Sequence, residues 1–107
     1  MLKLAILISG RGSNMLALIT AIEKQNLHCE IVCVIANKHA LGLKIAKTYG
    51  IPTKLIARAE YASKYEHEIA VLNELEKYQA TWIFLAGYMA ILSAEFINKF
   101  GGQIINI

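Results

Sequence analysis

The sequence predicts an α/β domain with a Rossmann-like open parallel sheet and helices on both faces. Strand-like apolar runs alternate with segments of helical periodicity, and the connections between them are short. The runs at 4–8 and 31–35 are apolar at every position, as in strands that helices bury on both sides. With 107 residues the chain has room for one core, since a domain usually takes on the order of 100–150 residues.

The first strand and helix are predicted around a turn that glycines force. Residues 2–8 are strand-like, and residues 9–13 contain two glycines and two serines that break the strand. A helix follows because apolar side chains recur at the spacing of one helix face. These side chains are Met15, Leu18, Ile19 and Ile22. We expect Ser13 or Asn14 to cap this helix.

The pattern then repeats with a second strand and helix. Residues 30–36 are expected to form the second strand, and a helix from about 40 to 49 should end at Gly50, with Pro52 just beyond it. Residues 53–56 predict a short third strand. This alternation favours parallel strands joined by right-handed crossovers.

The second half of the chain predicts two more helix and strand pairs. Ser63 and Glu66 match a capping box, which opens a long helix. Ser93 and Gly101 mark the start and the end of a short helix. The expected ranges are 63 to about 78 for the long helix, 82–86 for the fourth strand and 103–107 for the fifth strand.

We expect residues 1–107 to form one α/β domain, since no linker, repeat or low-complexity tract interrupts the pattern. The predicted last strand carries Ile104, Ile105 and Ile107, and no later element is available to cover it. A domain does not normally finish on such a strand. The domain is therefore expected to be truncated, with self-association through the uncovered strand as a consequence.

Charge and composition exclude several classes of partner. The net charge is +3, and the eleven Lys and Arg residues are scattered without a cluster, which indicates no nucleic-acid partner. All eight acidic residues are Glu, so a mechanism that needs an aspartate cannot be completed by this chain. The first apolar stretch ends at Ser9 and is too short for a signal peptide or a membrane span. We predict a cytoplasmic protein with no membrane partner.

The two cysteines are predicted to be free, buried thiols in a reducing compartment. Cys29 and Cys33 flank the start of the second strand, where extended chain separates them by ~13 Å, too far for a disulfide. One cysteine pair without a second pair also falls short of a zinc site. We therefore expect no metal.

The first loop, Gly10 to Asn14, has the composition of a phosphate-binding loop. Its glycines allow backbone to approach a ligand, Ser13 and Asn14 can donate hydrogen bonds, and a helix start favours an anion. The alternative is that the glycines only make the turn and Ser13 only caps the helix. The loop lacks the third glycine of the dinucleotide pattern and the Gly-Lys-Ser/Thr of nucleotide triphosphate loops. A monophosphate ester is thus favoured over ATP, and over the NAD of a dehydrogenase.

Three blocks in the same order are similar to glycinamide ribonucleotide formyltransferase. They are Ile-Ser-Gly-Arg-Gly-Ser-Asn at 8–14, Leu-Ala-Gly-Tyr-Met-Ala-Ile-Leu-Ser at 85–93 and Ile-Asn-Ile at 105–107. Methionyl-tRNA formyltransferase shares the architecture, but the first loop resembles the glycinamide ribonucleotide enzyme. The resemblance implies the amino-terminal half of the formyltransferase fold. It also implies transfer of a formyl group from 10-formyltetrahydrofolate to the amine of glycinamide ribonucleotide in de novo purine synthesis.

The same resemblance implies the site residues. The residues implied to hold the substrate phosphate are Gly12, Ser13 and Asn14. The residues implied to contact folate are Lys64, Leu85, Met89, Ala90, Ile91, Leu92 and Asn106. The family often has Arg at both 64 and 90, so we expect a weaker grip on the folate glutamate tail, because Lys lacks the bidentate fork. Lys64 has a second interpretation as a solvated helix residue.

Asn106 is the implied catalytic residue. A carboxamide at a strand end can donate to the negative charge that builds on the formyl oxygen, an effect of ~3–4 kcal/mol in comparable sites. Without the resemblance, an Asn at this position would be read as a turn former. The family supplies its general acid from a histidine beyond this asparagine. None of His28, His39 or His67 is expected to replace it, because each lies elsewhere in the predicted fold.

We therefore expect a chain that is inactive by itself and that retains ligand binding. The alternative function is a non-catalytic module that binds a phosphorylated metabolite through the first loop.

Overall fold

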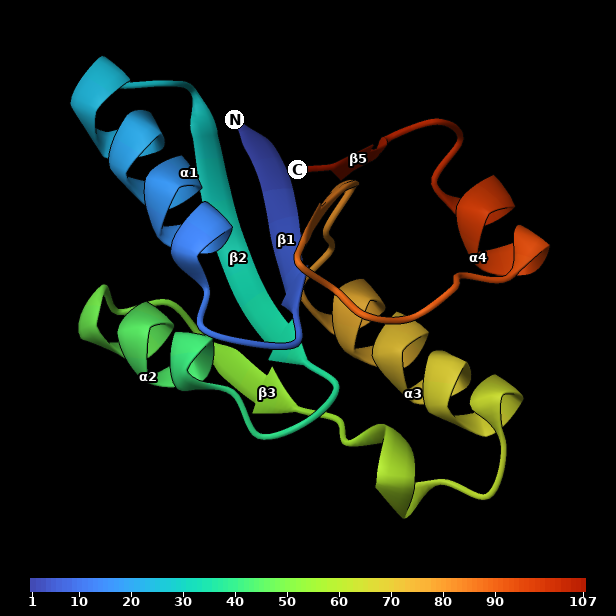
Figure 1. Ribbon diagram of the computed structural model, residues 1–107. Coiled ribbons are helices and arrows are strands. Elements are labelled where there is room, and N and C mark those ends of the chain that lie inside the picture. The colour runs from blue at the N-terminus through green and yellow to red at the C-terminus, as the bar shows by residue number, and fades with distance from the viewer.

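The computed structural model describes residues 1–107, and five parallel strands form one sheet in the order β3-β2-β1-β4-β5 (Figure 1). The strands are β1 Leu2–Ile8, β2 Cys29–Ala36, β3 Thr53–Leu55, β4 Trp82–Ala86 and β5 Ile104–Asn106. All four strand pairings are parallel, as predicted. β5 is shorter than expected, since only three residues pair with β4 at the edge of the sheet.

Four α-helices and one short 3-10 turn connect the strands. The helices are α1 Ser13–Gln25, α2 Leu41–Thr48, α3 Lys64–Lys77 and α4 Ala94–Lys99. The 3-10 turn, η1 Arg58–Glu60, was not predicted from the sequence, because three residues are too few to show a periodicity. None of the helices combines the length and the apolar character that crossing a membrane requires.

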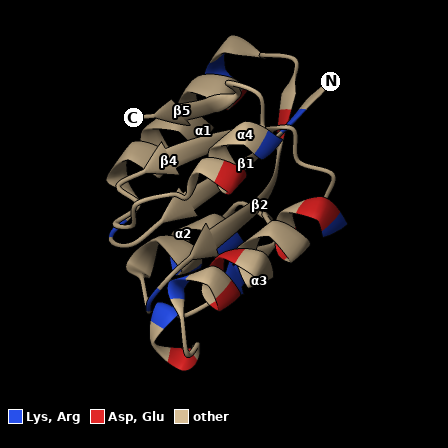
Figure 2. Ribbon diagram, turned by 90° about the vertical axis from the view of Figure 1, so that its right-hand side faces the viewer, with Lys and Arg blue, Asp and Glu red and all other residues tan.

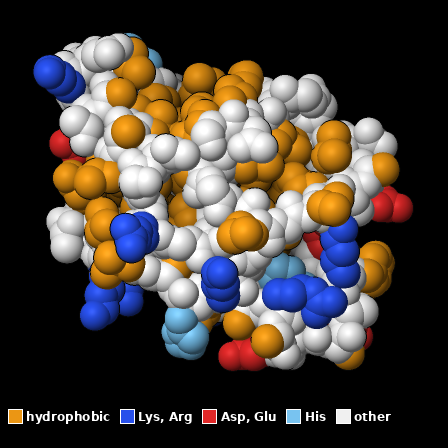
Figure 3. Space-filling view, viewed as in Figure 1, with side chains coloured by type: hydrophobic (Ala, Val, Ile, Leu, Met, Phe, Trp, Pro, Cys, Tyr) orange, Lys and Arg blue, Asp and Glu red, His pale blue; other side chains and the backbone are white.

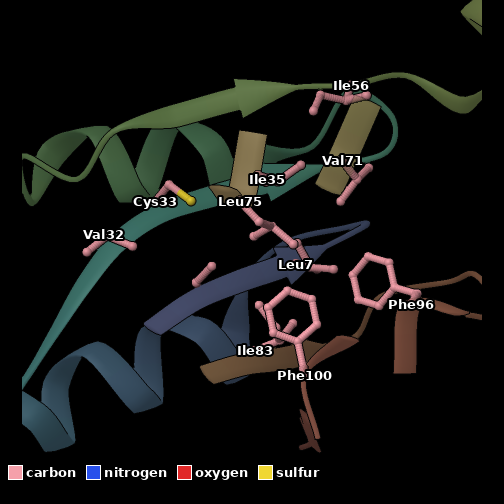
Figure 4. Packing of buried hydrophobic residues seen from close by; sticks show 11 residues of the cluster. Leu7, Val32, Cys33, Ile35, Ile56, Val71, Leu75, Ile83, Phe96 and Phe100 are labelled. Carbon is pink, nitrogen blue, oxygen red and sulfur yellow. The ribbon is translucent and has the colours of Figure 1, made fainter. Parts of the chain in front are cut away.

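The sheet lies between two helical layers, which confirms the predicted helices on both faces (Figure 1). Alternate β1 side chains point to opposite faces. Ile6 and Ile8 pack with Met15 of α1 in one cluster, whereas Leu7 belongs to the other cluster. Figure 4 shows that second cluster, where side chains from α3 and α4 meet the sheet. Its members include Leu7, Ile35, Val71, Leu75, Phe96 and Phe100.

Two of the predicted helix caps are confirmed and one is wrong. Ser63 Oγ accepts from the Glu66 N–H at 3.1 Å, and Ser93 Oγ accepts from the Phe96 N–H at 3.1 Å. The start of α1 is different, because Gly12 occupies the cap position in the left-handed region with φ +78°. No side chain caps this helix, so the expected cap by Ser13 or Asn14 does not form.

Most charged residues lie on the helices and loops, and the middle of the sheet is nearly free of them (Figure 2). Both cysteines are free, as predicted. Cys29 is only half-buried, whereas Cys33 is fully buried, and its burial, with the Glu74 carboxylate nearby, raises the pKa of its thiol to about 12.

Candidate functional site

The carboxyl ends of the strands meet along one edge of the sheet, which is where ligands bind in open parallel sheets. Four segments lie at this edge. They are the loop 9–12 after β1, the loop 37–40 after β2, the loop 87–93 after β4 and the end of β5. β1 and most of β2 are buried between the helical layers, and parallel pairing holds β4 and β5 beside them, so the segments keep fixed relative positions.

The first loop is packed tightly against the start of α2. A Cβ atom on Gly12 would lie 2.9 Å from the Cα of Gly42, and the Gly42 N–H donates to the carbonyl of Gly10 at 3.1 Å. Only glycine fits at position 12, because both the contact and the positive φ exclude a side chain. The loop therefore enters α1 in one defined conformation.

The start of α1 offers unpaired backbone donors. The first helical hydrogen bond runs from the Leu16 N–H to the Gly12 carbonyl at 2.8 Å, so the N–H groups of residues 13–15 precede it and have no intrahelical acceptor. Ser13 and Asn14 are exposed, and the first turn of α1 contains no acidic residue. Free N–H groups and the helix dipole together favour an anion at this position.

The end of β5 lies beside this helix start. The Asn14 side chain donates from Nδ2 to the carbonyl of Ile107 at 3.3 Å. In the sheet, Asn106 is the partner of Leu85, and the Ile107 N–H donates to the Leu85 carbonyl at 3.0 Å. The structure thus brings together three predicted site residues from α1, β4 and β5.

A cavity of about 650 Å³ opens next to the loop that follows β4. Its walls come from the loop after β2, the η1 turn, the first turns of α3 and the 88–92 segment. The predicted folate residues that line it are Lys64, Met89, Ala90, Ile91 and Leu92. Leu85 and Asn106 do not line it and lie instead on the neighbouring strands β4 and β5.

Basic side chains stand around this cavity. Lys38, Arg58 and Lys64 all line it, and the one acidic residue in its wall is Glu68. Figure 3 shows Lys, Arg and His side chains gathered in the lower part of one face of the molecule. The sequence did not point to Lys38 or Arg58, because neither belongs to a motif and Arg58 lies in the unpredicted η1 turn. The cavity suits an elongated ligand with an apolar body and an anionic end.

Glu68 joins α3 to the end of the β4 loop. Glu68 is 9% exposed, and its carboxylate accepts from the Ser93 N–H at 3.0 Å and from the Ser93 hydroxyl. Burial, together with the Glu68 charge, raises the pKa of Tyr88 to about 12.

None of the three histidines lies on β5 or in the loops 9–12 and 87–93. His28 directly precedes β2, at the opposite edge of the sheet, and His39 is exposed in the loop after β2. His67 lies in α3, as predicted, but it also lines the cavity, which the sequence did not show. Its Nε2 atom is 2.7 Å from the carbonyl oxygen of Ile56, so this nitrogen carries the proton and donates it.

The fold and this edge define an α/β domain built to bind small ligands beyond the carboxyl ends of its strands. The chain belongs to the formyl transferase family, whose model matches residues 2–107.

Similarity to named relatives extends over almost the whole chain. The chain is 44% identical to the trifunctional purine biosynthetic protein adenosine-3 of Gallus gallus, over 98% of this chain and 11% of that protein. The crystal structure of phosphoribosylglycinamide formyltransferase from Brucella melitensis superposes with a TM-score of 0.93 at 44% identity, over 97% of this chain and 55% of that one. A formyltetrahydrofolate deformylase from Pseudomonas putida KT2440 superposes with a TM-score of 0.87 at 28% identity, over 97% and 37% of the two chains.

These comparisons agree with the predicted Rossmann-like formyltransferase fold and with the resemblance to glycinamide ribonucleotide formyltransferases. The chain spans about half the length of the Brucella enzyme and a smaller share of the other two proteins.

Proposed function

We propose that this chain provides the amino-terminal half of a phosphoribosylglycinamide formyltransferase. Such an enzyme transfers a formyl group from 10-formyltetrahydrofolate to the amine of glycinamide ribonucleotide. The observation that carries the proposal is the meeting, at one sheet edge, of the free helix start of α1, the Asn106 carboxamide and the cavity beside the 88–92 segment. The names of the chicken, Brucella and Pseudomonas relatives support purine synthesis and formyl-folate chemistry.

The phosphate of the ribonucleotide is assigned to Gly12, Ser13 and Asn14. The unpaired N–H groups at the start of α1 supply donors, and the helix dipole supplies partial positive charge. Gly12 has no side chain, and position 12 has no room for one, so the phosphate can approach the backbone of the loop closely. The Asn14 side chain bonds to the Ile107 carbonyl, so it holds the phosphate site close to β5.

The folate is assigned to the cavity and the neighbouring β4 strand. Backbone groups of Ala90 and Leu92 would hold the pterin, with Met89, Ile91 and Leu85 as apolar wall. Lys64 is exposed at the first position of α3, where it can meet a carboxylate of the glutamate tail. Since Ala90 contributes no charge, Lys64 carries this contact without help from that position.

Asn106 is assigned the role of oxyanion donor. The amine of the ribonucleotide attacks the formyl carbon, a new C–N bond forms, and the C–N bond to the folate nitrogen breaks. A proton leaves the amine and a proton reaches the folate nitrogen. The Asn106 carboxamide would donate to the formyl oxygen while that oxygen carries negative charge.

Titration of the 107-residue chain by calorimetry tests the proposal. Glycinamide ribonucleotide and folic acid are both expected to bind. Lys64→Ala should weaken the binding of folic acid about threefold and leave the binding of the ribonucleotide unchanged. Binding of the ribonucleotide without any binding of folic acid would favour a non-catalytic module instead. A formylation assay on the same chain is expected to show no turnover, because these residues place no general acid beside Asn106.

The proposed partners are these small molecules, together with a second copy of the chain through the uncovered β5 strand. We also place the protein in the cytoplasm, where its two free cysteines would stay reduced.

A further inference from the structure

A ring of hydrogen bonds lies beneath the loop that follows β4. The Met89 N–H donates to Ser9 Oγ at 2.7 Å, and the Ser9 hydroxyl donates to Asn37 Oδ1 at 2.7 Å. The Asn37 side chain then donates from Nδ2 to the Met89 carbonyl at 3.3 Å, which closes the ring. Ser9 and Asn37 are 2% and 7% exposed. Two buried side chains thus satisfy both backbone groups of one loop residue.

The three members of the ring are not held equally by the rest of the fold. Asn37 is fixed through its backbone, since its N–H donates to the Ile8 carbonyl at 3.4 Å and its carbonyl accepts from the Arg58 N–H at 2.9 Å. Ser9 directly follows Ile8, which is in register with both β2 and β4.

Met89 has no comparable support. The bonds to Ser9 and Asn37 are the only hydrogen bonds made by any residue from 87 to 92, and the next anchor is the contact between Ser93 and Glu68. If the ring opens, the strand ends stay in place and the loop is the part that moves.

We propose that Ser9 and Asn37 are positioning residues that fix the backbone of the 87–92 loop. The inference rests on the proposed function for the identity of the ligand, because this loop is the one assigned to folate. Asn37 also lines the cavity, whereas Ser9 does not, so Ser9→Ala isolates the positioning role that both side chains share. They hold Met89, and Met89 sets where the backbone groups of Ala90 and its neighbours face the cavity.

The variant Ser9→Ala tests this role. It leaves the Met89 N–H without its acceptor and the buried Asn37 Oδ1 without its donor, while both strands keep their ladders. Because the loop then has to be ordered again on binding, we expect folic acid to bind about tenfold more weakly. Binding of inorganic phosphate at the start of α1 should change by less than about twofold, since Gly12 and Gly42 hold that loop independently.

The experiment measures both ligands by calorimetry and amide exchange by NMR in the 107-residue chain. Ser9→Ala and Asn37→Ala should each remove the protection of the Met89 amide and leave the β1 and β2 amides protected. The double variant should bind folic acid about as weakly as the weaker single variant, because the ring opens only once. Thr20→Ala is the matched control, since it removes a hydroxyl that bonds to the Leu16 carbonyl on the exposed side of α1.

Two results would overturn the inference. One is unchanged exchange at Met89 in Ser9→Ala. The other is loss of protection throughout β1 and β2 with equal losses of phosphate and folic acid affinity, which would show a general structural role. If the unaltered chain fails to bind folic acid, the proposed function fails, and the exchange at Met89 still decides whether the ring positions the loop.

Discussion

Cys33 illustrates how burial decides the chemistry of a single residue. Its thiol lies in the β2 part of the core with no exposed surface, and burial raises its pKa to about 12, whereas Cys29 four residues earlier is half-buried. A thiol reacts as the thiolate, so a buried thiol with a raised pKa is inert. We expect iodoacetamide at pH 8 to modify Cys29 in the folded chain and Cys33 only after unfolding. Mass spectrometry of tryptic peptides checks this, and equal labelling of both cysteines in the folded chain would contradict it.

The same pKa shift predicts how stability depends on pH. The thiol pKa of Cys33 rises from an ordinary value of 9.0 to about 12 on folding, so the folded state holds its proton more tightly than the unfolded state does. Its contribution to stability is complete below pH 9 and is lost as pH rises towards 12. Urea unfolding at pH 8 and pH 10.5 measures the free energy of unfolding. Between these two pH values it should decrease less for Cys33→Ala than for the unaltered chain, and an identical decrease would refute the raised pKa of Cys33.

Gly12 is the residue where backbone conformation is most demanding. It combines φ +78° with a would-be Cβ contact of 2.9 Å to the Gly42 backbone. Gly12→Ala is therefore expected to lower the free energy of unfolding by about 1–3 kcal/mol and to weaken phosphate binding. Gly10→Ala is the control for stability, since a Cβ there would meet nothing within 4 Å. Thermal unfolding measures the stability of both variants. Equal losses of stability would mean that the contact with Gly42 does not determine the effect at position 12.

At the scale of elements, the start of α4 is tied to α3 by one serine. Ser93 and Ser63 cap their helices with the same 3.1 Å bond, but Ser93 also donates twice to the buried Glu68 carboxylate. Removing the Ser93 hydroxyl leaves the Glu68 carboxylate with one donor fewer. This should lower the free energy of unfolding more than the loss of a helix cap alone.

We therefore expect Ser93→Ala to lower the free energy of unfolding by about 2–3 kcal/mol, against about 1 kcal/mol for Ser63→Ala. Chemical denaturation of the two variants gives this comparison directly. Similar losses for both would show that the contact with Glu68 adds nothing to the helix cap.

At the scale of the whole molecule, the two edges of the sheet differ. The β3 edge has Pro52 before it and Lys54 within it, two features that block strand pairing. The β5 edge has no charged residue from 101 to 107, and Ile105 and Ile107 are 37% and 42% exposed. The β5 edge therefore lacks the features that block strand pairing at the β3 edge.

We expect the 107-residue chain to associate through β5 as its concentration rises. Ile105→Lys should keep it monomeric, whereas Ile97→Lys, at an exposed position of α4, should not. Sedimentation velocity over a range of concentrations distinguishes these outcomes. A chain that remains monomeric at high concentration would contradict the prediction, and association unaffected by Ile105→Lys would place it at another surface.

Much of this fold could be predicted from local sequence. The uninterrupted apolar runs of β1 and β2 indicated strands buried on both faces, and Ser63 and Ser93 marked the starts of two helices. These signals depend on neighbours a few residues apart, so they survive without knowledge of the tertiary structure. The first loop was likewise visible as a possible anion site, because its glycines and the helix start are contiguous.

The tertiary structure alone decided how the site is assembled. The bond between Ser9 and Asn37 spans 28 residues and that between Ser9 and Met89 spans 80, and no spacing rule relates such positions. Gly12 caps α1 in place of Ser13, in a left-handed conformation that glycine allows, and its close packing against Gly42 appears only in the tertiary structure. The sequence by itself determined the class of fold and the order of its elements, because these follow from short-range patterns. Which side chains face one cavity was decided by the sheet, because only the folded sheet brings strand ends that are distant in sequence side by side.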